Sequence, residues 1–287
     1  MGHRRPHLKR LAGILSCCVV VVLGTAIGLR AAEAEDAEAL QPGTQVRLTF
    51  PDADLPPTLY SSLNKTAVPA CLTFRLPDDY SPAGLFPLVV YVPGNDGGLA
   101  GNIHNAESLA GPRGWIAATL PLFKKDIDRS GPAGGVHVSY EDYPVLSKAY
   151  QTMLGRLFER IPNIDREQSA MVGYSNGAIA IGVLVSNHDE FVLTHFRSYC
   201  MVDQGMFHLA DLHKSRTRDC RFLLLVGGRE GFGREVKIRQ SRLLQDSWEL
   251  LGVNLTYRVL EDSGHEFGER EMAVVRTWLQ ESAAFSK

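Results

Sequence analysis

Short apolar segments alternate along this chain with longer segments in which apolar residues recur every three to four positions. Eight of the short segments have the length of β-strands, and from the third onward they are continuously apolar instead of alternating with polar residues. Continuous apolar runs are typical of parallel strands that are buried on both faces of a sheet. The eight expected strands cover residues 46–50, 70–76, 88–92, 115–120, 169–172, 198–202, 222–226 and 254–260.

The longer segments predict helices between these strands. The last of them carries Met272, Val275, Trp278 and Leu279 at helical spacing, which is the pattern of an amphipathic helix covering a sheet. Alternating strands and helices favour βαβ crossovers, so we expect an α/β fold with a doubly wound, mostly parallel sheet of about eight strands. The expected helices cover residues 145–161, 178–187, 235–251 and 269–285.

The N-terminus has the pattern of an export signal. Residues 1–10 are basic, and residues 11–29 contain no charge. Small residues that suit a cleavage site follow, either Ala32 with Ala34 or Gly24 with Ala26. We therefore expect cleavage and export to the periplasm or the medium. Retention as a membrane anchor is the alternative, because the uncharged run reaches the roughly 18 residues at which a spanning helix becomes possible.

The expected organisation has three parts. Residues 1–34 are a signal peptide or an N-terminal anchor, residues 35–45 are a linker, and residues 46–287 form one α/β domain, whose chemistry is considered below. We find no internal repeat in the third part. The membrane is expected to be a partner only through an uncleaved N-terminal segment.

Charge and cysteine content exclude several classes of function. The chain has 30 Lys and Arg against 32 Asp and Glu, and removal of residues 1–34 changes this to 25 against 31, or −6. An acidic domain is not expected to bind nucleic acid by charge. The chain has no C-x-x-C pair, so nothing supports a thiolate zinc site, and we expect neither a metal nor another cofactor.

The strongest chemical motif is Gly173-Tyr174-Ser175-Asn176-Gly177, which matches G-x-S-x-G. It follows an expected strand and opens an expected helix of small residues. A tight strand-to-helix turn of this kind can hold a serine in a strained conformation, with its hydroxyl projecting above the sheet. Ser175 is therefore the candidate nucleophile, and a solvent-exposed serine in a glycine-rich turn is the alternative interpretation.

A serine hydroxyl needs a base that takes its proton, and His265 is the candidate. It follows the last expected strand, so it should reach the same carboxyl edge of the sheet as Ser175. Two carboxylates could orient this histidine. We expect Glu230 to do so, because it follows the strand that should neighbour the last one, and Asp203, after the preceding strand, is the alternative.

A glycine-rich turn, Pro93-Gly94-Asn95-Asp96-Gly97-Gly98, follows the third expected strand. Backbone N–H groups in such a turn can converge on a developing negative charge. The expected oxyanion donors are the amide of Asn176 and the amide of Asn95 or its neighbour. The glycine spacing fits neither G-x-G-x-x-G nor a phosphate-binding loop, so no motif supports a nucleotide site.

This order of strands and motifs resembles the α/β-hydrolase superfamily between about Thr44 and Phe285. The G-Y-S-N-G form, together with the export signal, is similar to secreted esterases of the feruloyl-esterase and polyhydroxybutyrate-depolymerase type. The resemblance implies Ser175 as nucleophile, His265 as base and Glu230 as acid.

We therefore expect an exported serine hydrolase that cleaves a small-molecule or polymeric carboxylic ester through an acyl-enzyme. A serine peptidase of the same fold is one alternative, and a catalytically inactive hydrolase fold that serves as a binding module is another. The segment 121–144, with Phe123, Tyr140 and Tyr143, is expected to line the substrate cleft. Cys200 and Cys220 are expected to remain unpaired, because an axial offset of about three residues would separate them by roughly 10 Å.

Overall fold

The computed structural model divides the chain into two units, Met1–Leu40 and Gln41–Lys287. Only Leu40 of the first unit is described, so the expected signal peptide at 1–34 lies outside the described residues. No helix among the described residues combines the length and the apolar character needed to cross a membrane. The structure describes residues 40–56, 60–61, 69–94, 103–124, 142–205, 217, 219–229 and 234–285.

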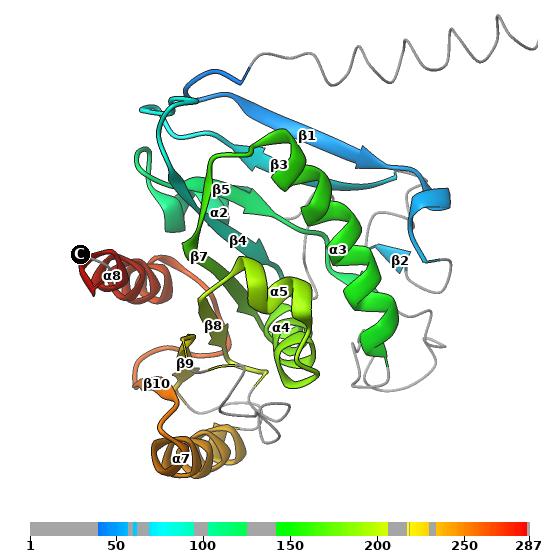
Figure 1. Cartoon of the computed structure of the whole chain (residues 1–287). Helices are drawn as coiled ribbons and strands as arrows, with labels where there is room; N and C mark the ends of the chain where they lie inside the picture. The colour runs from blue at the N-terminus through cyan, green and yellow to red at the C-terminus, as the bar shows by residue number, and fades with distance from the viewer. Residues whose placement is uncertain are drawn as a thin grey trace, which may run out of the picture. The chain divides into compact units, whose positions relative to one another are not determined.

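The second unit is built on an eight-stranded sheet with the order β1-β3-β5-β4-β7-β8-β9-β10 (Figure 1). Strand β3 runs antiparallel to both of its neighbours, and the pairs from β5 to β10 are parallel. The prediction of a mostly parallel, eight-stranded α/β sheet is therefore confirmed. The strands are β1 (Gln45–Phe50), β3 (Ala70–Arg75), β4 (Phe86–Val92), β5 (Ile116–Thr119), β7 (Ile164–Tyr174), β8 (Ser198–Val202), β9 (Arg221–Gly227) and β10 (Asn254–Leu260).

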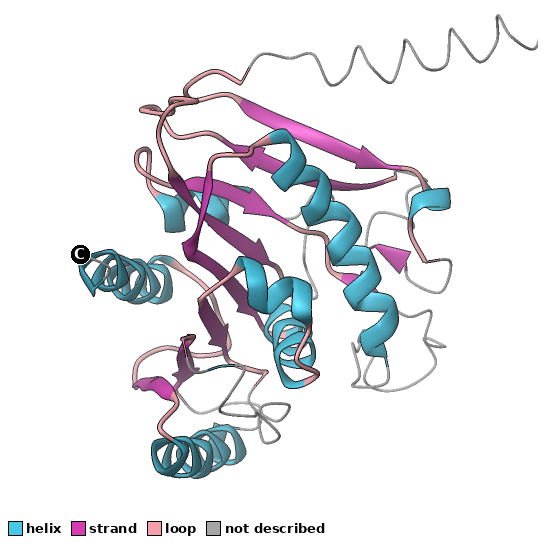
Figure 2. Ribbon diagram, in the orientation of Figure 1, coloured by secondary structure: helices cyan, strands magenta, loops and turns pink. Residues whose placement is uncertain are grey.

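Helices cover both faces of this sheet (Figure 2). Two of them, α2 and α8, contact each other over one face, while α3 and α4 contact each other over the other face, and α7 packs on β9 and β10. The four apolar residues expected to face the sheet from the last helix are all buried in its core. The helices are α2 (Ile103–Ala110), α3 (Tyr143–Arg160), α4 (Asn176–Ser186), α5 (Glu190–His195), α7 (Arg234–Leu251) and α8 (Glu269–Phe285).

Two short helices and two short strands were not expected from the sequence. Helix α2 has eight residues and α5 has six, and β2 (Tyr60–Ser61) pairs with β6 (Phe123–Lys124) in a separate two-stranded ladder. Helix α5 begins where the carboxylate of Asp189 accepts the N–H of Val192 at 2.9 Å, an N-cap that satisfies one of the unpaired amides of the first turn.

The register of the parallel strands brings their carboxyl ends to one edge. Val92 pairs with Gly173, Tyr174 with Val202, and Gly227 with Leu260. The residues that follow β7, β8 and β10 therefore emerge beside one another, although they lie far apart in the sequence.

Candidate active site

Ser175 lies in the sharp turn between β7 and α4. Its backbone has φ 52° and ψ −117°, a conformation that a residue with a side chain rarely adopts. The turn is held from β8, because the N–H of Ser175 donates to the carbonyl of Val202 at 2.9 Å. It is held from β4 by contact, because a Cβ added at Gly177 would lie 2.0 Å from the carbonyl oxygen of Val92. This geometry is the strained strand-to-helix turn that the sequence motif predicts.

His265 lies in the loop after β10 and faces the serine. Its Nε2 is 3.1 Å from Oγ of Ser175. The loop is held by Tyr174, whose hydroxyl donates to the carbonyl of His265 at 2.7 Å and whose ring lies 5.2 Å from the imidazole. Phe267 stacks on Tyr174 and on Tyr91, which joins the loop to the core. The structure thus brings together the two residues that the sequence analysis selected first.

Asp203, directly after β8, contacts the other side of the imidazole. Its Oδ2 is 3.2 Å from Nδ1 of His265, and its Oδ1 accepts the N–H of Gly227 at 2.7 Å. The residue is 1% exposed and has φ 61°, a second left-handed backbone at this edge of the sheet. Ser175, His265 and Asp203 therefore form one continuous line of side-chain contacts.

Glu230, the acid preferred from the sequence, lies outside the described residues, so its assignment stays a prediction. The strand order confirms that β9 lies between β8 and β10, which was the reason for preferring it. The histidine loop nevertheless crosses the end of β9: a Cβ added at Gly227 would lie 2.1 Å from the carbonyl oxygen of Gly264. This crossing carries His265 toward β8, where Asp203 can reach it.

The expected oxyanion donors are described only in part. Asn176 is the first residue of α4, a position at which backbone N–H groups have no partner within the helix. Asn95 lies outside the described residues. The preceding residue, Gly94, lies against the turn, because a Cβ added there would be 3.3 Å from Cβ of Ser175. The chain after β4 thus leaves the sheet beside the serine, as the sequence analysis expected.

Lys237 is a functional candidate that the sequence analysis missed. It projects from α7, is 5% exposed, and places its Nζ 3.4 Å from Nδ1 of His265. Burial lowers the pKa of its ammonium group, and the negative charge of Asp203 acts in the opposite direction. A signal was present in the sequence: Lys237 shares the buried face of α7 with Ser241 and Trp248, where an apolar residue would be usual.

The expected cleft residues behave differently from one another. Phe123 is fully buried, with its ring 5.5 Å from that of Tyr150, so it belongs to the core and its expected place in a cleft is wrong. Tyr140 lies outside the described residues. Tyr143 is half-buried at the first position of α3.

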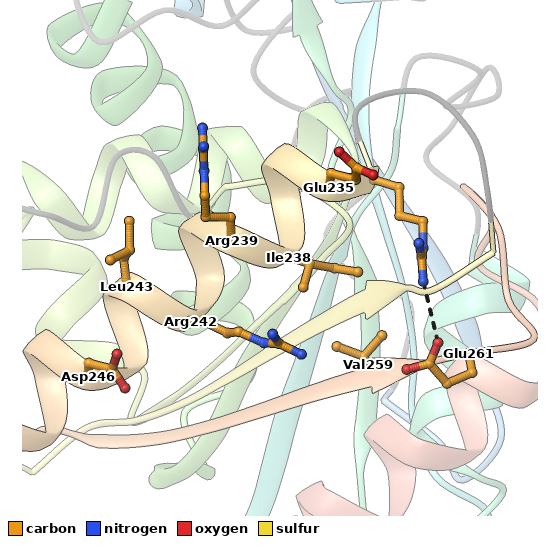
Figure 3. Close-up of a pocket in the computed structure, with 9 residues that line it drawn as sticks. Glu235, Ile238, Arg239, Arg242, Leu243, Asp246, Val259 and Glu261 are labelled. Carbon is orange, nitrogen blue, oxygen red and sulfur yellow. Dashed lines mark ion pairs between the residues drawn. The ribbon is translucent and has the colours of Figure 1, made fainter.

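A separate groove of about 430 Å³ lies between α7 and β10 (Figure 3). Ile238 and Val259 face each other across it, and Arg234 pairs with Glu261 at 3.7 Å near one end. None of Ser175, His265 and Asp203 lines this groove. Among the described residues, no group of three or more His, Cys, Asp or Glu side chains could hold a metal ion.

No family model matches the chain, and no curated protein matches it significantly. Similar solved structures do exist. A fungal esterase of Rhizomucor miehei is 12% identical over 90% of this chain and 89% of its own, with a TM-score of 0.52. A thermostable esterase is 18% identical over 82% of this chain and 62% of its own, with a TM-score of 0.50. The acylaminoacyl peptidase of Pyrococcus horikoshii is 12% identical with a TM-score of 0.53; the match covers 84% of this chain and 41% of the peptidase.

Proposed function

Starting from the α/β-hydrolase fold that this chain shares with those esterases and that peptidase, we propose that it is a serine hydrolase that cleaves a carboxylic ester through an acyl-enzyme on Ser175. One observation carries the proposal. The side chains of Ser175, His265 and Asp203 form a hydrogen-bonded line at the carboxyl edge of the sheet, with contacts of 3.1 and 3.2 Å.

Each contact has a chemical role. Nε2 of His265 takes the proton of the Ser175 hydroxyl as the oxygen attacks the ester carbonyl, and it then returns that proton to the leaving alcohol. Nδ1–H of His265 donates to Asp203, which fixes the tautomer that leaves Nε2 free to accept. Asp203 stays in place because the N–H of Gly227 holds its second oxygen at 2.7 Å.

The second half of the reaction uses the same groups. Water replaces the alcohol, loses a proton to His265 and attacks the acyl-enzyme, so that the carboxylic acid leaves and Ser175 recovers its hydrogen. The tetrahedral intermediate of each half carries a negative oxygen. The amide of Asn176 at the start of α4, with an amide of the turn after Gly94, is proposed to donate to it.

Ester cleavage is proposed ahead of peptide cleavage because two of the three similar structures described above are esterases and one is a peptidase. We further propose that the enzyme is exported, on the basis of the basic and then uncharged N-terminal segment. The substrate is proposed to be a small or polymeric ester.

The first test is covalent labelling with a fluorophosphonate probe, combined with turnover of a p-nitrophenyl ester. Ser175→Ala should fold normally, take up no probe and lose about 10⁶ in kcat, the typical cost of losing a triad nucleophile. The matched control is Ser247→Ala on the exposed side of α7, which should label and turn over as the wild type does. A Ser175→Ala variant that keeps a tenth of the turnover would remove Ser175 from the mechanism.

The second test separates the alternatives. We expect turnover of p-nitrophenyl esters to exceed that of acylated amino-acid and peptide p-nitroanilides. The opposite order would favour the peptidase. A folded wild type that neither labels nor turns over any substrate would favour an inactive binding module. Esters of rising acyl length, a feruloyl ester and a polyester film then define the substrate.

A further inference from the structure

The side-chain amino group of Lys237 lies against Nδ1 of His265, the proposed catalytic base. Its Nζ lies 3.4 Å from Nδ1 of His265, on the side of the ring opposite Ser175, and the residue is 5% exposed. A lysine buried to this extent beside a titratable ring is uncommon, because removing an ammonium group from water is costly unless it is paired.

The contact cannot be an ordinary hydrogen bond in the reactive state. When Nε2 is free to accept the serine proton, Nδ1 carries hydrogen and donates to Asp203. An ammonium group has three donors and no acceptor, so it has nothing to offer Nδ1–H. A neutral amine carries no charge and has a lone pair, so it can face Nδ1–H without repulsion while that hydrogen stays with Asp203.

The conflict grows during the reaction. Once His265 has taken the serine proton, the ring is an imidazolium cation, and an ammonium group 3.4 Å away repels it. Asp203 attracts both cations, but it does not need Lys237 to remain in place, because the Gly227 N–H contacts one of its oxygens and His265 contacts the other.

The other charged groups near α7 do not cancel this repulsion. Arg229 and Glu266 pair with each other, and Glu261 pairs with Arg234. Among the described residues, the titratable groups shown to interact with Lys237 are Asp203 after β8 and His265 after β10. The elements that α7 packs against also carry Arg229 after β9, Tyr257 on β10, and Glu261 and Glu266 after β10.

Building on the proposed function, we propose that Lys237 is a positioning residue that sets the pH range of catalysis: its ammonium form opposes the imidazolium that His265 must form, and its amine form does not. Lys237 touches neither the serine nor the substrate in this scheme. It acts through His265 alone.

The direction of the pH effect follows from the environment of Lys237. Burial lowers its pKa below the usual value for lysine, and Asp203 only partly offsets this. Below that pKa the residue is charged and turnover is restrained; as the pH rises through it, the charge is lost and turnover increases. The expected signature is a rise in kcat on the alkaline side, at a pH below that of an ordinary lysine.

The test compares three proteins between about pH 6 and about pH 10, a span that starts below the reference pKa of histidine and ends near that of lysine. Lys237→Met removes the charge and keeps a chain of similar length. It should raise kcat at neutral pH by about tenfold, the effect of one pKa unit, with KM unchanged and no alkaline rise. Lys237→Arg stays charged throughout, so it should remain slow at every pH.

Arg239→Met, an exposed change on the same helix, is the control and should reproduce the wild-type profile. A Lys237→Met variant with an unchanged melting temperature and a profile parallel to that of the wild type would overturn the proposal, as would a fall in kcat at all pH values. If Lys237→Met does not fold, the Arg variant decides, because an alkaline rise in it contradicts the proposal.

The two proposals fail in distinguishable ways. Turnover that survives Ser175→Ala contradicts the proposed function and therefore also contradicts this inference, which depends on it. Turnover that depends on Ser175 but not on the charge at position 237 contradicts the inference alone.

Discussion

Two residues of the proposed triad have a left-handed backbone. Ser175 has φ 52° and Asp203 has φ 61°, and His188 is the remaining residue other than glycine with positive φ among those the structure describes. Such conformations cost about 1–3 kcal/mol each and persist only where the surroundings enforce them. Here the enforcing contacts are hydrogen bonds to the neighbouring strand, from Ser175 N–H to Val202 and from Asp203 N–H to Leu225. The strain at each residue therefore turns its side chain out of the strand direction and toward His265.

The acid can be tested by comparing two isosteric changes. Asp203→Asn should lower kcat by about 10²–10⁴ with little change in KM, because an amide in place of the carboxylate no longer favours the tautomer with hydrogen on Nδ1. Glu230→Gln should cost less than about tenfold. Steady-state kinetics on both variants, with melting curves to confirm folding, gives the ranking. The reverse ranking would restore the acid role to Glu230.

For single residues, the sequence identifies the proposed nucleophile and base better than it identifies the side chains that contact them. Ser175 and His265 follow from a motif and from a position after a strand. The choice between Asp203 and Glu230 depends on a loop that crosses the end of β9, where Gly227 leaves room for Gly264. Lys237 depends on which face of α7 meets the sheet. Local residue preferences do not specify the path of that loop, and the helical spacing that puts Lys237 on the same face as Trp248 does not show that this face meets His265.

At the scale of elements, length decides what the sequence can predict. All eight strands of the main sheet and the four long helices follow from apolar periodicity, to within a few residues at their ends. The largest error in a predicted strand start is at β7, which begins at Ile164 and not at residue 169. Its first half is polar, with Asp165, Arg166, Glu167 and Gln168, so it gives no apolar signal in the sequence. The short helices α2 and α5 carry too few periodic positions to stand out, although Asp189 caps the start of α5.

Two Gly→Ala substitutions, one in α3 and one in α4, compare an open position on a helix with a position packed against β4. At Gly155 in α3, an added Cβ meets nothing within 4 Å, so Gly155→Ala should stabilise the protein by about 0.5–1 kcal/mol through helix propensity. At Gly177 in α4, the same Cβ would lie 2.0 Å from the carbonyl of Val92, so Gly177→Ala should cost about 3 kcal/mol or more and displace Ser175.

Urea denaturation gives both changes in the free energy of unfolding, and probe labelling reports on the turn. Equal stabilities for the two variants would mean that α4 can move away from β4. Loss of labelling in Gly155→Ala would contradict the distinction between the two positions.

At the scale of the whole molecule, the number of free cysteines tests both the strand register and the cleavage of the N-terminal segment. Cys71, Cys200 and Cys220 are free and buried. Cys200 lies opposite Leu223, three positions beyond Cys220 on the neighbouring strand, which is too far for a disulfide. Burial raises the pKa of the Cys220 thiol to about 11, so it should react slowly in the folded protein.

Thiol counting under denaturing, non-reducing conditions should therefore give three reactive thiols in exported protein. Retention of the N-terminal segment adds Cys17 and Cys18 and raises the count to five. Intact mass measured on the same sample should show the loss of a segment that ends near Ala26 or Ala34. A count of one in processed protein would mean that Cys200 and Cys220 are joined and that the strand register is wrong.

The way β4, β8 and the loop after β10 together hold Ser175 also has a consequence for how the protein is made. The serine and its base are 90 positions apart in the chain, and the strained turn persists only once the two neighbouring strands have docked. While the last quarter of the chain is still being synthesised, the nascent protein already contains the whole G-Y-S-N-G sequence. It still lacks His265, so Ser175 is not yet reactive. Covalent labelling of Ser175 during refolding should accordingly lag behind the appearance of helix, so that the active site itself marks the moment at which the sheet is complete.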